Sequence, residues 1–141
     1  MTWEDKELLL KDLCARLPYG VKVLYDNEVF GIEYISPMYG EVKFDTSVNW
    51  TIGVSDIKPY LFPLSSMTDE QRKEFLSVAG YEKRVEDCGR HTETYYYDMV
   101  GHEHKFYPNS DAIDWLNKNH FDYRGLIEKG LAIDATGLNI Y

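Results

Sequence analysis

Four histidines and two cysteines are the residues of this sequence best suited to binding a metal ion. His102 and His104 are two positions apart, so on a β-strand both side chains would project from the same face. Cys88 and His91 precede them, and His120 follows. Zinc prefers imidazole and thiolate ligands. The spacing makes His91, His102 and His104 candidate metal ligands, but a solvent-facing hairpin gives the same pattern. Because neither HExxH nor CxxC occurs, the exposed hairpin is the preferred interpretation and no metal is expected.

Other residues with catalytic chemistry have simpler explanations. An imidazolium at His91 could activate the Cys88 thiolate, but nothing in the sequence supplies an orienting partner. Asp111 with Asp114 fits the first turn of a helix, where the helix dipole favours negative charge. There is no P-loop, GxGxxG or GxSxG motif. We therefore expect no catalytic residue and no cofactor, so a small enzyme or metal protein is the alternative hypothesis.

Twelve tyrosines in 141 residues are more than a core of this size needs. Tyrosine is enriched in contact surfaces because its ring buries a large area at a small cost in entropy. Tyr39, Tyr60 and Tyr141 are expected to be partly exposed, as are Tyr95 and Tyr97. The predicted binding surface consists of Tyr95, Tyr97, His102 and His104. Cross-strand packing of the tyrosines within a sheet is the competing interpretation.

The first 54 residues predict a helix followed by four short strands. Leucines recur every four residues after Thr2, a suitable N-cap, and Pro18-Tyr19-Gly20 ends the helix. Apolar and polar residues then alternate, and Asp26-Asn27 supplies the first turn. An antiparallel meander has one apolar face, which the leading helix is expected to cover. The ranges are 2–17 for the helix and 21–25, 30–34, 41–45 and 48–54 for the strands, the last being the clearest and fully buried on one face.

The remaining residues predict helices and a second hairpin. Pro59 and Pro63 argue against a central strand, so residues 57–64 are expected to form an irregular crossover. Thr68 and Gln71 form a capping-box pattern that begins a helix ending before Gly80. The other expected elements are a hairpin through Val100-Gly101 with a return strand at 105–107, helices at 110–120 and 123–129, and a last strand or extended tail at 131–140.

Size and charge limit the class of protein. The fold class is α+β in a single domain, 1–141, with lobes at 1–64 and 65–141. The formal net charge of −9 repels nucleic-acid backbones, so the expected partner is a protein. An inhibitor that mimics nucleic acid is a sharper alternative. No apolar run reaches the roughly 20 residues of a membrane helix, so we expect a cytoplasmic protein that does not bind membranes; the oligomeric state is not predicted.

Two segments resemble recurring blocks of a family of small uncharacterised proteins from gut bacteria and from their phages and mobile elements. The first block, KPYLFPLSSMT, covers residues 58–68, and the second, WLNKNHFDYRGLIEKGLA, covers residues 115–132. The resemblance implies a setting in phage or prophage biology and in the cytoplasm. It implies no mechanism. Together with the missing catalytic motifs and the surplus of tyrosines, it favours a non-enzymatic accessory protein that binds another protein.

Overall fold

The computed structural model describes residues 1–46, 49–79, 81–87, 92–98 and 110–141, with the backbone alone in 81–87 and 92–98. By its internal contacts the chain forms two compact units. Unit 1 consists of residues 1–66 and 117–141, and unit 2 of residues 67–116. That the chain behaves as a single domain stays a prediction.

The first element is helix α1, Trp3–Arg16, and its prediction is confirmed. Thr2 and Asp5 form a capping box: the Asp5 N–H donates to Thr2 Oγ1 at 3.1 Å, and the Thr2 N–H donates to the Asp5 carboxylate. The helix therefore satisfies two of the donors that a helix start leaves free. A short 3₁₀ turn, η1 (Leu17–Tyr19), follows and ends at Gly20, whose φ of 72° suits glycine.

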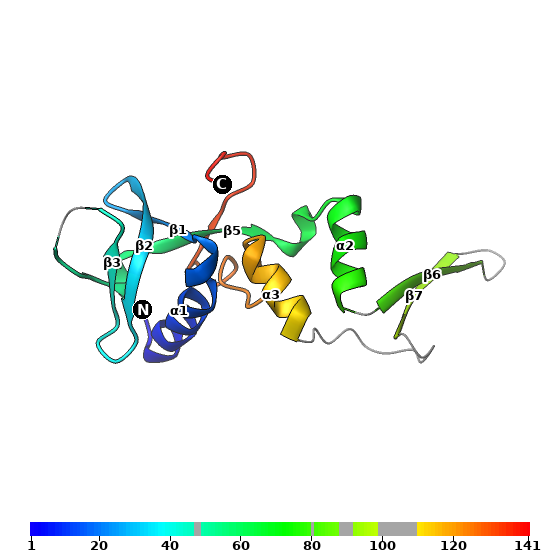
Figure 1. The fold of residues 1–141 in the computed structure, drawn as a ribbon, viewed down its shortest axis with the longest axis horizontal. Coiled ribbons are helices and arrows are strands. Elements are labelled where there is room, and N and C mark those ends of the chain that lie inside the picture. Colours follow the sequence, from blue (N-terminus) through cyan, green and yellow to red (C-terminus); the bar gives the residue numbers. More distant parts are fainter. Residues whose placement is uncertain (47–48, 80, 88–91, 99–109) are drawn as a thin grey trace. The chain divides into compact units, whose positions relative to one another are not determined.

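The predicted four-stranded meander is also confirmed. Its strands are β1 (Lys22–Tyr25), β2 (Glu28–Ser36), β3 (Glu41–Phe44) and β4 (Ile52–Gly53), and each pairs antiparallel with the next. Helix α1 lies beside these strands (Figure 1), and Leu9 and Leu13 are fully buried in a core cluster with Val23 and Val42. The helix covers the apolar face of the sheet, as expected.

Strand β4 is much shorter than predicted. Only Ile52 and Gly53 pair with β3, and the turn η2 (Val54–Asp56) follows at once. The prediction that one whole face is buried is wrong at Trp50, which is 51% exposed. The Trp50 ring packs edge-on against Tyr25, with 6.2 Å between centroids, and so leaves the alternation that the sequence suggested.

The irregular crossover expected at 57–64 is in fact strand β5, Lys58–Pro63, in the interior of the sheet. Its register explains why proline is tolerated. Pro59 pairs with Val23 of β1, whereas the pairing on the other side begins only at Tyr60. Pro63 is the last residue of the strand. Each proline therefore occupies a position where its missing donor need not interrupt a ladder.

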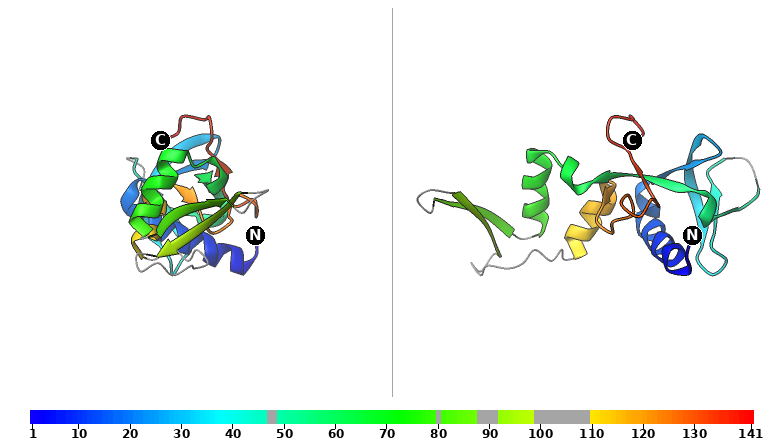
Figure 2. Two further views of the ribbon diagram at one scale, coloured as in Figure 1. Left: turned by 90° about the vertical axis from the view of Figure 1, so that its right-hand side faces the viewer. Right: turned by 180° about the vertical axis from the view of Figure 1, so that it is seen from behind.

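The C-terminal segment completes the sheet with two short parallel strands. Strand β8 (Phe121–Asp122) and strand β9 (Ile133–Asp134) both pair with β5, so the order is β4-β3-β2-β1-β5-β8, with β9 also on β5. In the rear view of Figure 2 the C-terminal segment passes next to β5, with which β9 pairs in parallel. A helix and a mainly antiparallel sheet with further helices confirm the α+β class.

The short helix expected at 123–129 is absent, and turns occupy this segment. Gly125 has a φ of 75°, which is outside the helical region. The Asp122 carboxylate accepts hydrogen bonds from the N–H groups of Leu126 at 3.0 Å and Ile127 at 2.9 Å. Because a side chain satisfies these donors, the segment folds without a helical ladder.

The segment after β5 contains two helices and a pair of strands. Helix α2, Asp69–Ala79, has the expected capping box: Gln71 N–H donates to Thr68 Oγ1 and Thr68 N–H donates to Gln71 Oε1. Strands β6 (Tyr81–Asp87) and β7 (Thr92–Asp98) pair antiparallel, and this pairing is a different one from the predicted hairpin through Val100-Gly101. Helix α3 is Ser110–Lys118. The turn at Val100-Gly101 and the return strand at 105–107 lie outside the described residues.

Candidate functional site

The structure leaves the predicted binding surface untested. Tyr95 and Tyr97 belong to β7, where they pair with Arg84 and Glu82 of β6, but their side chains are not described. His102 and His104 lie outside the described residues, as do Cys88 and His91. The two hypotheses that rest on these residues, a contact surface and a metal site, stay predictions. Among the residues that the structure does describe, no three His, Cys, Asp or Glu residues are placed to share an ion.

The tyrosines predicted to be partly exposed behave differently from one another. Tyr39 is 75% exposed, and Tyr141 is 43% exposed. Tyr60 was expected to be exposed, and this is wrong: only 7% of it is accessible. Tyr60 lies in β5, an interior strand that was not predicted because it contains two prolines.

A recess among the described residues is an aromatic pocket in unit 1. It has a volume of about 240 Å³ and is lined by Glu28, Phe30, Phe44, Thr46 and Trp50. Phe30 and Phe44 stack with their centroids 4.4 Å apart and their planes within 4°. Tyr25 joins the rings, because it contacts Phe44 at 5.7 Å and Trp50 at 6.2 Å. The five lining residues together with Tyr25 are called the aromatic pocket below.

Local strand geometry explains how the aromatic pocket forms. Side chains two positions apart on a strand share a face, which brings Glu28 beside Phe30 on β2 and Thr46 beside Phe44 at the end of β3. Tyr25 and Glu28 are the last pair of the β1–β2 ladder. The two residues between them, Asp26 and Asn27, both have positive φ values, of 48° and 62°. This is the tight two-residue turn of a hairpin.

The charge in the lining of the aromatic pocket is of one sign, negative. Glu28 is the single ionisable residue in its lining, Thr46 adds a hydroxyl, and the other three lining residues are rings. Phe44 is nearly buried, whereas Trp50 presents half of its surface to solvent. The pocket therefore has a rigid aromatic base, an exposed tryptophan and one carboxylate.

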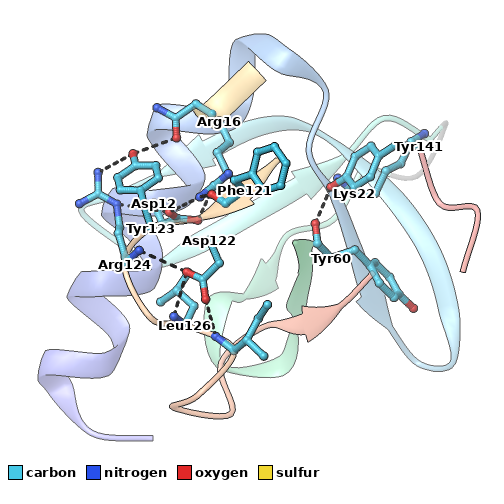
Figure 3. Close-up of polar contacts among 12 residues, drawn as sticks. Asp12, Arg16, Lys22, Tyr60, Phe121, Asp122, Tyr123, Arg124, Leu126 and Tyr141 are labelled. Atoms are coloured by element: carbon cyan, nitrogen blue, oxygen red, sulfur yellow. Dashed lines mark hydrogen bonds and ion pairs between the residues drawn. The ribbon is translucent and has the colours of Figure 1, made fainter. Parts of the chain in front are cut away.

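A second polar cluster, drawn in Figure 3, is buried. Arg16 donates to both carboxylate oxygens of Asp12, at 2.8 and 3.1 Å, and to the Phe121 carbonyl at 2.7 Å. Both side chains are fully inaccessible. Arg124 Nε lies 3.2 Å from the same carboxylate. Because two guanidinium groups hold Asp12, it is not free to act as a general base, and the cluster joins α1 to the C-terminal segment.

Tyr123 extends this buried cluster toward Asn117. Its hydroxyl donates to Asn117 Oδ1 at 2.9 Å and accepts from Arg124 at 3.2 Å. The guanidinium carbons of Arg16 and Arg124 lie 5.3 and 4.9 Å from the centroid of the Tyr123 ring, within cation–π range. Because these side chains bond to one another within the chain, we assign the cluster a structural role.

His120, the one histidine that the structure describes, also has a structural setting. Its ring stacks on Tyr141, with centroids 3.6 Å apart and planes within 10°. Burial, together with the positive charge of Arg16, lowers the pKa of His120 to about 4. The Tyr141 hydroxyl donates to the Tyr60 carbonyl and accepts from the Lys22 N–H, and burial raises its pKa to about 12 (Figure 3).

Sequence reasoning missed the aromatic pocket because it assigned its residues to the core. Tyr25, Phe30, Phe44 and Trp50 all occur at positions where the alternation of apolar and polar residues predicts an inward side chain. One signal was available: six aromatic residues fall within the 26 residues from Tyr25 to Trp50, which is a large number of rings for so small a sheet to bury.

No helix of the described part of the chain has the length and apolar character to cross a bilayer.

Comparison with known proteins identifies no relative. No protein-family model, no curated protein and no solved structure matches the chain.

Proposed function

We propose that the protein is a non-enzymatic accessory protein that binds another protein through the aromatic pocket. The observation that carries this proposal is Trp50, which is 51% exposed beside a recess whose other rings either belong to the core, as Phe44 does, or pack against it, as Phe30 does. Tryptophan is among the residues that contribute most to binding when a partner covers them. A half-exposed tryptophan beside a recess is therefore well placed to contact a partner protein.

The chemistry of the lining supports binding over catalysis. General acid–base catalysis uses two groups whose environments separate their pKa values. The aromatic pocket supplies one carboxylate, Glu28, with a threonine hydroxyl and rings. The other described cluster, around Asp12, has its carboxylate engaged by Arg16 and Arg124.

A phage or mobile-element setting is part of the same proposal. It is supported by the two sequence blocks at 58–68 and 115–132. In the structure these blocks form β5, the turn η3 (Leu64–Ser66), the end of α3, β8 and the turns after it. They build the sheet interior and the buried cluster, so they report on a shared scaffold and leave the partner open.

The test is capture of a partner from lysate of the bacterial host with the immobilised full chain. Trp50→Ala should lose the retained protein, because it removes the exposed ring while leaving the core residues in place. The matched control is Trp3→Ala, since Trp3 is 69% exposed on α1 and bonds only to Glu7 of its own helix in the described contacts. Equal capture by wild type and Trp50→Ala would contradict the proposal.

The surface predicted from sequence can be compared in the same assay. Variants at Tyr95 with Tyr97, and at His102 with His104, remove that surface in two steps. Loss of capture in these variants but not in Trp50→Ala would move the contact to the second hairpin and its neighbourhood. The metal site at His91, His102 and His104 and the mimicry of nucleic acid stay predictions.

A further inference from the structure

We infer that the aromatic pocket binds the cationic end of a lysine side chain of its partner, in the N-methylated form. This inference rests on the proposed function, because it names the group that a bound protein would insert. Four properties favour this group: the volume of the cavity, the aromatic faces, the negative charge of Glu28 and the weak hydration of a methylated ammonium.

The size of the cavity suits one side chain. Pockets that hold a whole small molecule have volumes of roughly 300–1,000 Å³. The aromatic pocket has about 240 Å³ and opens beside an exposed tryptophan. A linear alkyl chain with a compact head group fits such a recess, and a lysine on a protein surface presents this shape.

The rings favour a cation. Aromatic faces carry negative electrostatic potential, so an organic cation within about 6 Å of a ring centroid is attracted to it, most strongly by tryptophan. Phe30 and Phe44 stack as one wall, and Tyr25 links that wall to Trp50. Rings from three parts of the meander thus meet around a single small cavity.

The charge of the lining has the matching sign. Glu28 contributes a carboxylate, and the described residues that line the pocket include neither lysine nor arginine. The chain as a whole carries a formal charge of −9, which attracts cationic partners over a longer range. An anionic ligand would be repelled by both, and a neutral apolar ligand would gain nothing from Glu28.

The hydration of the head group favours the methylated form. An unmodified lysine ammonium is a compact, strongly hydrated charge, and it must give up bound water to contact the rings. The oxygens of Glu28, Thr46 and Tyr25 could replace some of that water, but the rings of the lining cannot. A trimethylammonium group has no N–H donor and is weakly hydrated, so it loses less on leaving water and keeps its attraction to the rings.

The experiment is an NMR titration of the full chain with three probes of nearly equal shape. They are N-acetyl-trimethyllysine amide, N-acetyl-lysine amide, and the neutral isostere in which carbon replaces the charged nitrogen. We expect the trimethylated probe to shift the Trp50 indole N–H and the Thr46 amide, with an affinity about tenfold above each of the other two. Shifts confined to residues around Tyr25 would support the same site.

Three variants give the matched controls. Trp50→Ala should weaken binding of the trimethylated probe by about tenfold or more, and Glu28→Gln by about threefold with a weaker dependence on salt. Trp3→Ala should bind as wild type does. Thermal unfolding of each variant establishes that it is folded, and Phe44 is left unchanged because it is part of the core.

The outcomes separate this inference from the proposed function. If the neutral isostere binds as tightly as the trimethylated probe, the pocket is merely apolar and the cationic inference is overturned. Equal binding of the unmodified lysine probe overturns the choice of the methylated form. If no probe binds while capture from lysate still depends on Trp50, the inference fails and the proposed function stands.

Discussion

At the scale of single residues, the buried polar groups of the described structure hydrogen-bond segments that are far apart in the sequence. Asp12 and Arg16 are one helical turn apart on α1, and Arg16 also bonds the Phe121 carbonyl 105 positions away. Removing one partner of such a buried pair leaves a charge without compensation, which costs several kcal/mol. The same region holds His120, whose protonation is opposed by burial and by Arg16.

His120 makes stability depend on pH in mildly acidic solution. Its pKa is about 4 in the folded protein and about 6.5 when unfolded, so the unfolded chain binds the proton more tightly. Its contribution is complete above about pH 6.5 and is lost as the pH falls toward 4. The loss is smaller than the roughly 3 kcal/mol that the full shift would give, because solvent reaches part of the ring and screens its charge. Urea unfolding at pH 7.5 and pH 4.5 measures it.

The control for this prediction is His120→Asn. His120 has a φ of 62°, and asparagine tolerates this left-handed conformation better than most residues do. The variant keeps the carboxylates that also titrate, and it lacks the imidazole. Its stability should fall less than that of wild type between the two pH values; an identical fall would show that His120 contributes nothing.

At the scale of elements, turns set the register that assembles the aromatic pocket. The Asp26-Asn27 turn closes the β1–β2 hairpin directly between Tyr25 and Glu28. A two-residue hairpin needs positive φ at both central positions, and Asn-Gly or Asp-Gly sequences supply it best. The turn is therefore a point where a single substitution acts on the strand pairing and on the pocket together.

Substitution of Asn27 tests the strain in this turn. Asn27→Gly should raise the free energy of unfolding by a few tenths of a kcal/mol, because glycine adopts positive φ without a steric penalty. Asn27→Val should lower it by about 1–2 kcal/mol, the cost of a β-branched residue in the left-handed region. Chemical denaturation of the two variants measures both effects. Equal stabilities would show that the turn does not require φ above zero.

At the scale of the whole molecule, the main core belongs to one unit. All residues of the core cluster, from Leu9 to Ala132, lie in residues 1–66 or 117–141. The chain leaves unit 1 after β5 and returns to it at β8, and these two strands pair in parallel. The Phe62 N–H donates to the His120 carbonyl at 2.8 Å, which holds the departing and returning segments together.

Unit 1 should therefore fold without residues 67–116. We expect a variant in which a Gly/Ser linker of about ten residues replaces them to unfold cooperatively, since the joined segment exceeds the dozen or so residues that a parallel connection needs. Dispersed amide signals by NMR, with the Trp50 indole at its wild-type position, would show the retained fold. A disordered spectrum would mean that residues 67–116 are required for the core of unit 1.

Local patterns in the sequence determined where α1 and α2 begin and where the first tight turn lies. The caps at Thr2 and Thr68 and the turn at Asp26-Asn27 involve residues within a few positions of one another, so their energetics can be read from the chain itself. The alternation of apolar residues and the turns between them likewise predicted that the first four strands form a meander. These features needed no knowledge of distant contacts.

Tertiary structure decided the features that depend on partners far along the chain. The prolines of β5 are tolerated because of where β1, β8 and β9 pair with it, and the segment after Asp122 forgoes a helix because one carboxylate takes its donors. The same alternation that sends Ile52 into the core would send Trp50 there too. Only the packing of Trp50 on Tyr25 places it at the edge of a pocket, because a ring's burial depends on what the rest of the fold leaves uncovered.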